Sequence, residues 1–175
     1  MGEVDNAFSD LPAEVLQASM KEHQKFFSLK NSKTGKIERF ITVANIEAPD
    51  NGETILKGNQ KVLYARLSDA KFFWENDIRL IQKDGLDAWL GKLVNVTFHN
   101  KLGSQADKVT RVSALTKILA KRLLCDIEDA VKSANICKSD LASEMVYEFP
   151  ELQGVMGRYY ALSAGYSQDV AKVCE

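Results

Sequence analysis

Residues 138–161 have the sequence KSDLASEMVYEFPELQGVMGRYYA, and this stretch holds two predicted helix starts on either side of a proline. Ser139 or Asp140 can cap a helix over residues 141–147, because a short side-chain oxygen accepts hydrogen bonds from backbone N–H groups in a first helical turn. Pro150 is expected to end that helix and to open the next, since its fixed φ suits a first turn. The stretch therefore predicts two helices joined by a tight turn.

The second predicted helix carries glycines where alanine would be more stable. Gly154, Gly157 and Ala161 follow one another at spacings of three and four residues along one side, and each glycine costs the helix about 1 kcal/mol relative to alanine. Small residues in that pattern allow another backbone or a ligand to approach closely. Close helix packing is the favoured interpretation, and a nucleotide stacked on Tyr159 or Tyr160 is the alternative.

Upstream of this stretch the hydrophobic pattern changes. Residues 1–10 are polar and predicted to be a loose segment, and a helix is expected to open at Leu11 and Pro12 with Asp10 as its cap. Residues 25–46 are rich in aromatic and β-branched side chains at a period of two, around the turn NSKTGKIE, which predicts a β-hairpin. Two strands alone are marginally stable in water, so the hairpin must join a larger sheet or lie on helices.

A turn-rich segment, APDNGE at residues 48–53, is the best candidate for an internal boundary. We therefore predict a mixed α/β segment over residues 1–55, the end of an upstream domain, and a helical domain over residues 56–175. The expected fold class is α+β and mostly α. The first helix of the helical domain is long, because its apolar residues recur every three or four positions: Leu63, Leu67, Ala70, Trp74, Ile78 and Ile81.

A further helix is predicted over residues 105–123, and it is strongly basic. Between residues 100 and 124, six cations oppose a single acid, Asp107, although the whole chain has a net charge of -1. One flank of this helix carries Lys108, Arg111 and Arg122 and can contact a phosphate backbone. The alternative is that this flank is a solvated surface whose cations pair with Asp107 or Asp126. The cations are Lys101, Lys108, Arg111, Lys117, Lys121 and Arg122, and the expected inner face is Val109, Val112, Thr116, Leu119, Ala120 and Leu123.

Composition and motifs exclude several classes of function. The chain is 45% hydrophobic and 27% charged, as in ordinary soluble domains, and it lacks a membrane-spanning or secretion segment, which predicts a cytoplasmic protein. Cys125, Cys137 and Cys174 lack the spacing of a zinc site and are expected to be reduced. The motifs GxxxxGKS/T, GxGxxG, HExxH and GxSxG do not occur, and neither His23 nor His99 is followed by aspartate. We therefore predict no catalytic and no metal-binding residue.

Several segments together resemble the beta-subunit family of bacterial tetrameric glycyl-tRNA synthetases. They are LPAEVLQASMKEHQKFF, RFITVANI, GNQKVLYARLSDAKFFWENDI, LGSQADKVTR and KSDLASEMVYEFPELQGVMGRYYA. They follow in the family's order from Glu3 to Glu175 with similar gaps, and the last segment is highly specific. Beta subunits of this family are several times longer, and the last predicted helix has no stop before Glu175, so we expect an internal fragment of such a subunit.

The resemblance implies a division of labour. In this family the alpha subunit activates glycine with ATP and Mg²⁺, whereas the beta subunit is required for charging and binds glycine tRNA. The resemblance also implies that residues 56–175 form a helical domain similar to the HD phosphohydrolases but without their metal motif. Lys138, Ser139 and Asp140 stand where those hydrolases have His-Asp, and Asp140 is then best explained as a helix cap. The chain itself is expected to be non-catalytic and to bind neither membrane nor DNA.

A tRNA partner favours phosphate contacts for exposed cations. The candidates are Lys108, Arg111 and Arg122 on the predicted basic helix, with Arg66 and Arg158 in addition. Contact with the alpha subunit can use the same surfaces. Two alternatives stay open: an HD-type phosphohydrolase with unusual metal ligands, and a purely structural scaffold between the alpha subunit and the tRNA-binding end.

Overall fold

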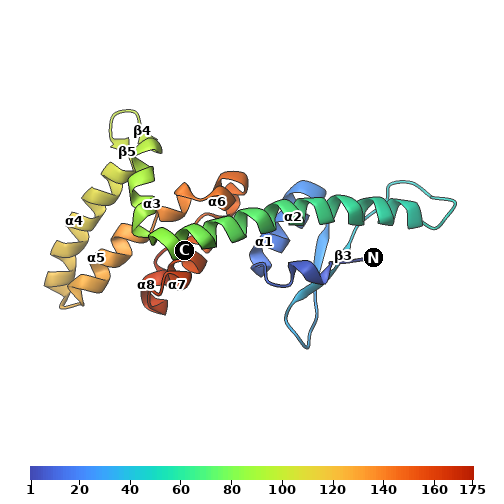
Figure 1. Ribbon diagram of the computed structural model, residues 1–175, viewed down its shortest axis with the longest axis horizontal. Helices are drawn as coiled ribbons and strands as arrows, with labels where there is room; N and C mark the ends of the chain where they lie inside the picture. The colour runs from blue at the N-terminus through green and yellow to red at the C-terminus, as the bar shows by residue number, and fades with distance from the viewer. The chain divides into compact units, whose positions relative to one another are not determined.

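The computed structural model describes residues 1–175, with the exception of the side chain of His23. Most of the chain is helical, and a small antiparallel sheet lies near its start (Figure 1), which confirms the predicted class at this level. The chain forms two compact units, residues 1–74 and residues 75–175, and the division falls inside helix α2 (Glu53–Asp84). The domain boundary expected between residues 55 and 56 stays a prediction.

The sheet of the first unit has three strands in the order β1, β3, β2, with antiparallel neighbours throughout. Strands β2 and β3 form the predicted hairpin. Strand β1 corrects the prediction that residues 1–10 are loose, because Gly2 pairs with Phe40 of β3. A strand of two residues is too short to show side-chain alternation, so its sequence carries no signal. The strands are β1 (Gly2–Glu3), β2 (Phe27–Lys30) and β3 (Ile37–Ile41).

Helix α1 begins without the expected cap. Pro12 occupies the N-cap position, where its carbonyl oxygen accepts the first helical hydrogen bonds. No described side chain caps this helix, so the prediction that Asp10 does so is wrong. Asp5 instead caps the preceding turn η1, by accepting from the N–H of Ala7 at 2.8 Å. The elements are η1 (Asn6–Phe8), α1 (Ala13–Ala18) and the π-helical turn η2 (Ser19–His23).

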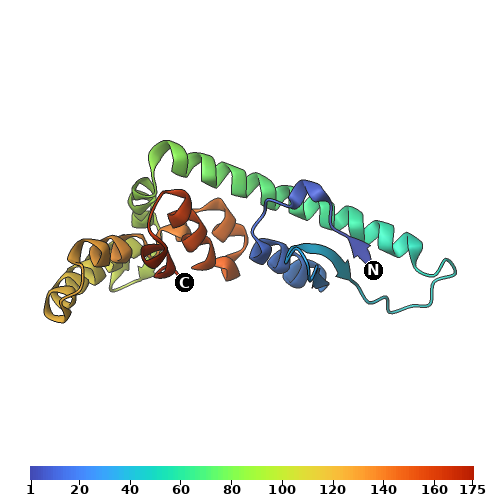
Figure 2. The same cartoon turned by 90° about the horizontal axis from the view of Figure 1, so that it is seen from below.

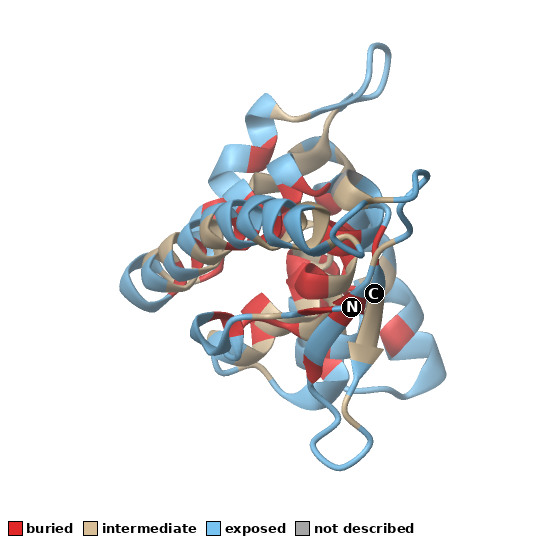
Figure 3. Cartoon of the chain, turned by 90° about the vertical axis from the view of Figure 1, so that its right-hand side faces the viewer, coloured by how far each residue is buried: buried red, intermediate tan, exposed pale blue. Residues whose placement is uncertain are grey.

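The core of the first unit contains residues of the sheet, of α1 and of one stripe of α2. Phe26 and Phe40 stack with their ring centroids 4.8 Å apart. The predicted stripe of α2 is confirmed here, since Leu63, Leu67 and Ala70 are buried (buried residues are red in Figure 3). The core residues are Phe8, Leu11, Leu16, Met20, Phe26, Ile37, Phe40, Leu63 and Leu67.

In the second unit a β-hairpin and a helical hairpin follow the end of α2. Gly85 ends α2 in the left-handed conformation (φ 75°), as glycine commonly does after a helix. Helices α4 and α5 pack side by side (Figures 1 and 2), and α4 has the predicted bounds. The elements are α3 (Asp87–Lys92), η3 (Leu93–Asn95), β4 (Thr97–His99), β5 (Gly103–Ser104), α4 (Gln105–Leu123) and α5 (Ile127–Ile136).

Residues 138–161 fold as short elements rather than as two helices. The helix that was expected after Pro150 is interrupted at Gly154, whose φ of 86° is a conformation that residues with a Cβ rarely adopt. Helix α7 ends ahead of Gly165, and Ser167 caps α8, both as predicted. The elements are η4 (Ser139–Ala142), α6 (Glu144–Glu148), η5 (Pro150–Leu152), α7 (Val155–Ser163) and α8 (Gln168–Lys172).

The cap of α6 also differs from the prediction. The hydroxyl of Ser143 accepts a hydrogen bond from the N–H of Val146 at 3.0 Å, so Ser143 is the cap rather than Ser139 or Asp140. The hydroxyl of Ser139 donates to the carbonyl oxygen of Ile136 at 2.8 Å. Because three candidate caps lie within five residues, local sequence alone could not select among them.

Candidate functional site

Helix α4 begins at a capping box. The hydroxyl of Ser104 accepts from the N–H of Asp107 (3.2 Å), and the N–H of Ser104 donates to the Asp107 carboxylate (2.8 Å). The hydrogen bonds from Ser104, helped by the charge of Arg111, hold the pKa of Asp107 below its ordinary value. Gly103 (φ 88°) leaves the space that the Asp107 side chain fills. These bonds are local, which explains why the sequence predicts the start of α4 correctly.

Three of the predicted cations lie along α4. Arg111 and Arg122 are exposed, and neither forms an ion pair with an acidic side chain among the described residues. Lys108 is half-buried, and its ammonium lies 4.4 Å from the centroid of the Phe98 ring, a cation–π contact. The structure thus brings these three residues to one helix and leaves its two arginines available to a partner.

The two acids that were expected to pair with these cations act as helix caps. Asp107 belongs to the capping box of α4, and Asp126 caps α5 by accepting from the N–H of Asp129 at 2.8 Å. A carboxylate at a helix N-terminus is stabilised by unpaired N–H groups and by the helix dipole. Neither acid forms a salt bridge with Arg111 or Arg122 among the described residues, although the charges of Arg111 and Asp107 still attract each other.

The expected inner face of α4 is only partly correct. Val109 and Ala120 are buried, whereas Val112, Leu119 and Leu123 are exposed. Helix α5 is the main neighbour of α4, and η3 and the β4–β5 hairpin also contact it. These neighbours together cover a narrower face of α4 than the apolar residues of the expected inner face would occupy. An apolar surface is consequently left uncovered beside the cations.

The other two predicted cations do not join this surface. Arg66 is exposed on α2 in the first unit. Arg158 lies on α7, where its Nε donates to Glu175 Oε1 at 2.6 Å and its guanidinium lies 4.5 Å from the centroid of the Tyr159 ring. These contacts hold Arg158 within the second unit.

A buried carboxylate that the sequence analysis missed lies in the second unit. Asp77 accepts from the N–H groups of Glu144 and Met145, each at 3.1 Å, and from the hydroxyl of Tyr160 at 2.6 Å. Burial raises the pKa of Asp77, and these hydrogen bonds oppose the rise. The available signal was a charged residue at position 77, in step with Trp74 and Ile81 on the apolar stripe of α2.

Asp140 does not cap α6 as expected and instead contacts the residue that precedes α7. Its Oδ2 accepts from the N–H of Gly154, which precedes α7, at 2.5 Å. Burial raises the pKa of Asp140, opposed by the Gly154 N–H and by the charge of Lys138. A Cβ on Gly157 would stand 2.9 Å from Cys174 Cβ and 3.2 Å from Asp140 Cγ. Close packing is therefore the use of this glycine, and Tyr160 is buried rather than open to a stacked nucleotide.

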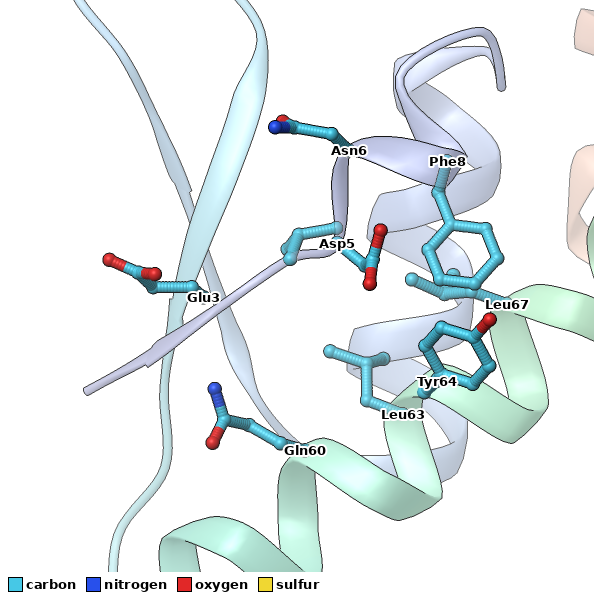
Figure 4. A pocket seen from close by; sticks show the side chains of 9 residues that line it. Glu3, Asp5, Asn6, Phe8, Gln60, Leu63, Tyr64 and Leu67 are labelled. Atoms are coloured by element: carbon cyan, nitrogen blue, oxygen red, sulfur yellow. The ribbon is translucent and has the colours of Figure 1, made fainter.

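A hollow in the first unit combines polar and aromatic side chains (Figure 4). Two of its polar residues serve the local structure: Asp5 caps η1, and Glu3 pairs with Arg39 at 3.3 Å. Phe8 and Tyr64 pack edge to face, with ring centroids 5.1 Å apart. The lining residues are Glu3, Val4, Asp5, Asn6, Phe8, Gln60, Leu63, Tyr64 and Leu67.

Two kinds of site are not found within the described residues. Nowhere in them do three or more His, Cys, Asp or Glu side chains gather so that they could hold a metal ion. Among the same residues, no helix combines the length and the apolar content that crossing a bilayer requires.

Comparison with known proteins gives the family. A family model described as glycyl-tRNA synthetase beta subunit matches residues 1–175. The chain is 62% identical to a glycine–tRNA ligase beta subunit of Ruegeria sp. (strain TM1040), 59% to one of Dinoroseobacter shibae and 44% to one of Marinobacter nauticus. These alignments cover at least 98% of this chain but only 24–26% of each relative, so the chain spans about a quarter of their length. The chain belongs to the glycyl-tRNA synthetase beta subunit family.

Proposed function

We propose that this chain is a non-catalytic part of a glycine–tRNA ligase beta subunit, and that it supports the glycylation of tRNA by binding tRNA, the alpha subunit, or both. The ligase assignment rests on relatives that carry this name and match the whole chain. The binding role rests on one observation, the surface of α4, where Lys108, Arg111 and Arg122 gather and the two exposed arginines form no salt bridge among the described residues. In this proposal the alpha subunit supplies the ATP and Mg²⁺ chemistry.

The helical second unit is proposed to follow the HD fold without its metal motif. Lys138, Ser139 and Asp140 take the place of the His-Asp pair. Asp140 is buried. Its Oδ2 accepts a hydrogen bond from the N–H of Gly154 just ahead of α7, and its Oδ1 is buried without a hydrogen-bond partner among the described residues. That arrangement supports a structural role for Asp140, because a metal ligand would need an oxygen directed toward an accessible site. We also propose that the helical domain begins near residue 56.

The cations of the proposed binding surface are not equivalent. Arg111 and Arg122 are exposed and unpaired among the described residues, so either can approach a phosphate or a carboxylate. Lys108 would have to give up part of its contact with Phe98. Arg66 is a separate candidate in the first unit, and Arg158 is the weakest one because it is bound to Glu175.

The test uses the full-length beta subunit assembled with its alpha subunit. In the double variant Lys108→Glu, Arg111→Glu, we expect glycine-dependent ATP–pyrophosphate exchange to be unchanged and glycylation of tRNA to fall by about tenfold or more. If the surface holds tRNA, the slope of log affinity against log salt also falls by about one for each phosphate that the variant no longer neutralises.

The matched control is Lys117→Glu, Lys121→Glu, which makes the same change of charge on the opposite side of α4. It is expected to affect glycylation much less. Unchanged glycylation, tRNA affinity and subunit association in the first variant would leave a structural scaffold as the better explanation. Stoichiometric bound metal together with phosphodiester turnover would instead overturn the non-catalytic assignment.

A further inference from the structure

The turn that leads into α2 contains an asparagine followed by a glycine. Residues 50–53 have the sequence DNGE, and they connect the loop after β3 to α2 (Figure 1). Asn51 is exposed, and its side chain forms no hydrogen bond among the described residues. Gly52 has a φ of 82°, and an added Cβ there would meet no atom within 4 Å. Neither a side chain at position 52 nor packing around it hinders movement of this peptide.

This pair of residues allows a reaction within the chain. The backbone nitrogen of Gly52 can attack the side-chain amide carbon of Asn51, because the two atoms belong to adjacent residues and close a five-membered ring. A bond forms from the nitrogen to that carbon, and the carbon–nitrogen bond of the side-chain amide breaks. Ammonia leaves with the proton of the Gly52 N–H, and a water molecule then opens the ring at one of its two carbonyl groups.

The product depends on which carbonyl group the water attacks. Attack at the former side-chain carbon gives aspartate with a normal backbone. Attack at the backbone carbon gives isoaspartate, in which the main chain runs through the side-chain carbon and is one carbon longer. Both routes consume one water and release one ammonia for each asparagine, and neither needs an oxidant, a metal ion or an enzyme.

Another asparagine with a small residue after it is held in place. Asn31 precedes Ser32, but its Nδ2 donates to Glu38 Oε2 at 2.7 Å and its Oδ1 accepts from the N–H of Lys33 at 2.9 Å. These bonds fix the side-chain amide, which must turn toward the next backbone nitrogen in order to react. Asn31 is therefore expected to react more slowly than Asn51.

The chain contains one further acid or amide directly before glycine, Asp84–Gly85. Aspartate can close the same ring with loss of water. The N–H of Gly85, however, donates to the carbonyl oxygen of Ile81 at 2.9 Å within the end of α2. The N–H of Gly52 donates instead to the exposed carboxylate of Asp50 at 3.1 Å, a bond with which water competes. The structure thus favours reaction at residue 51.

We propose that Asn51 is a site of spontaneous modification and that its isoaspartyl product loosens the start of α2. Asp50 holds this start, because its Oδ1 accepts from the N–H of Gly52 and its Oδ2 accepts from the N–H of Thr54 at 2.9 Å. N–H groups at a helix start lack helical acceptors and depend on such a side chain. An additional backbone carbon after residue 51 displaces both N–H groups from Asp50. The chain therefore carries a mark that accumulates with the age of the molecule.

The first experiment measures the reaction in the full-length beta subunit assembled with its alpha subunit. Samples are kept at neutral and at mildly alkaline pH and digested, and the peptides that contain residues 31 and 51 are analysed by mass spectrometry. We expect the peptide with residue 51 to convert into two products of equal mass, aspartyl and isoaspartyl. Conversion should be faster at the higher pH, because the attacking nitrogen must lose its proton. In water enriched in oxygen-18, both products should gain the heavy oxygen.

Two variants control this measurement. Gly52→Ala should slow conversion by about tenfold or more, since a methyl group hinders ring closure and about 1.4 kcal/mol in a barrier is a factor of ten in rate. Asn51→Gln would have to close a larger ring and should give no product over the same period. A residue 51 peptide that stays intact, or that converts no faster than the residue 31 peptide, would overturn the proposed modification.

The second experiment tests the effect on α2. Amide hydrogen exchange of residues 53–57 is compared in the fresh subunit, in the converted fraction of the aged subunit and in the variant Asn51→Asp. This variant has the added negative charge but the normal backbone. We expect exchange to be about fivefold faster in the converted fraction alone, as the loss of a cap worth about 1 kcal/mol implies. Unchanged exchange after conversion, or equally fast exchange in Asn51→Asp, would overturn the loosening of α2.

Discussion

Two regions of the second unit hold charged groups in opposite ways. Around residues 138–161, the carboxylates of Asp77 and Asp140 are buried. Asp77 accepts three hydrogen bonds, two of them from the start of α6, and Asp140 accepts one from the N–H of Gly154, just ahead of α7. Along α4, Arg111 and Arg122 are exposed and unpaired among the described residues. A buried carboxylate that accepts backbone hydrogen bonds is committed to the fold, whereas an exposed cation without a salt bridge is available to a partner. Charge in the sequence therefore does not mark a binding site until burial and partners are known.

The comparison predicts that replacing Asp77 lowers the stability of the folded chain more than any other change considered below. In Asp77→Ala, the N–H groups of Glu144 and Met145 and the hydroxyl of Tyr160 lose their shared acceptor. Buried donors left without partners are costly, and we expect the free energy of unfolding to fall by about 3–5 kcal/mol. Urea unfolding followed by circular dichroism measures this change.

The matched variant on the other region is Arg111→Ala. Because Arg111 is exposed and makes no ion pair among the described residues, its loss should change the free energy of unfolding by no more than about 0.5 kcal/mol. A comparable loss of stability in both variants would erase the distinction between the two regions.

Two glycines sharpen the contrast between packed and open helix surfaces. In Gly157→Ala, the new methyl group meets Cys174 and Asp140, so we expect a loss of about 1–3 kcal/mol in unfolding free energy. Gly58 also lies in a helix, but no atom stands within 4 Å of an added Cβ, so Gly58→Ala should stabilise the chain by up to about 1 kcal/mol. Calorimetric unfolding of the two variants should show shifts of opposite sign.

The end of α4 offers a smaller and stabilising change. Leu124 follows α4 in the left-handed conformation (φ 56°) while 93% exposed. A leucine there adopts an unfavourable backbone conformation and gains almost no burial. We expect Leu124→Gly to raise the free energy of unfolding by about 1 kcal/mol, measured as a higher midpoint in thermal unfolding. A lower midpoint would show that this side chain makes a contact that its exposure conceals.

The smallest expected effect is a dependence on pH. Burial keeps the folded-state pKa of Asp140 above its unfolded value, so its contribution to stability is complete below a pH of about 4 and is lost as the pH rises through the raised pKa. The asparagine of Asp140→Asn does not ionise, so this variant does not lose stability in this way. Its free energy of unfolding relative to the wild type should therefore increase as the pH rises through that window.

Asp107 provides the control of opposite sign. Hydrogen bonds from Ser104 keep its pKa below the unfolded value, so its contribution is present above the unfolded pKa and is lost as the pH falls. Asp107→Asn should therefore lose stability relative to the wild type as the pH rises through about 4. Chemical unfolding at a series of pH values distinguishes the two, and slopes of the same sign would contradict the assignment.

The features that the sequence predicts correctly are those with local causes. The hairpin of β2 and β3, the span of α2 and the bounds of α4 follow from periodicity, turn residues and a capping box within a few positions. The errors have distant causes. Asp77 meets Tyr160 across 83 residues, and Gly2 finds its partner on β3. The exposure of Val112, Leu119 and Leu123 on α4 belongs to the same class, since periodicity shows an apolar face but not whether a neighbour covers it.

The three thiols differ in burial, so one of them can be labelled selectively. Burial raises the pKa of Cys137, and that of Cys174 to about 12, so both hold little of the reactive thiolate at neutral pH. Cys125 is exposed in the turn between α4 and α5, just beyond the end of α4. A maleimide dye should therefore label the unmodified chain there first, and its fluorescence would follow the approach of a partner in real time.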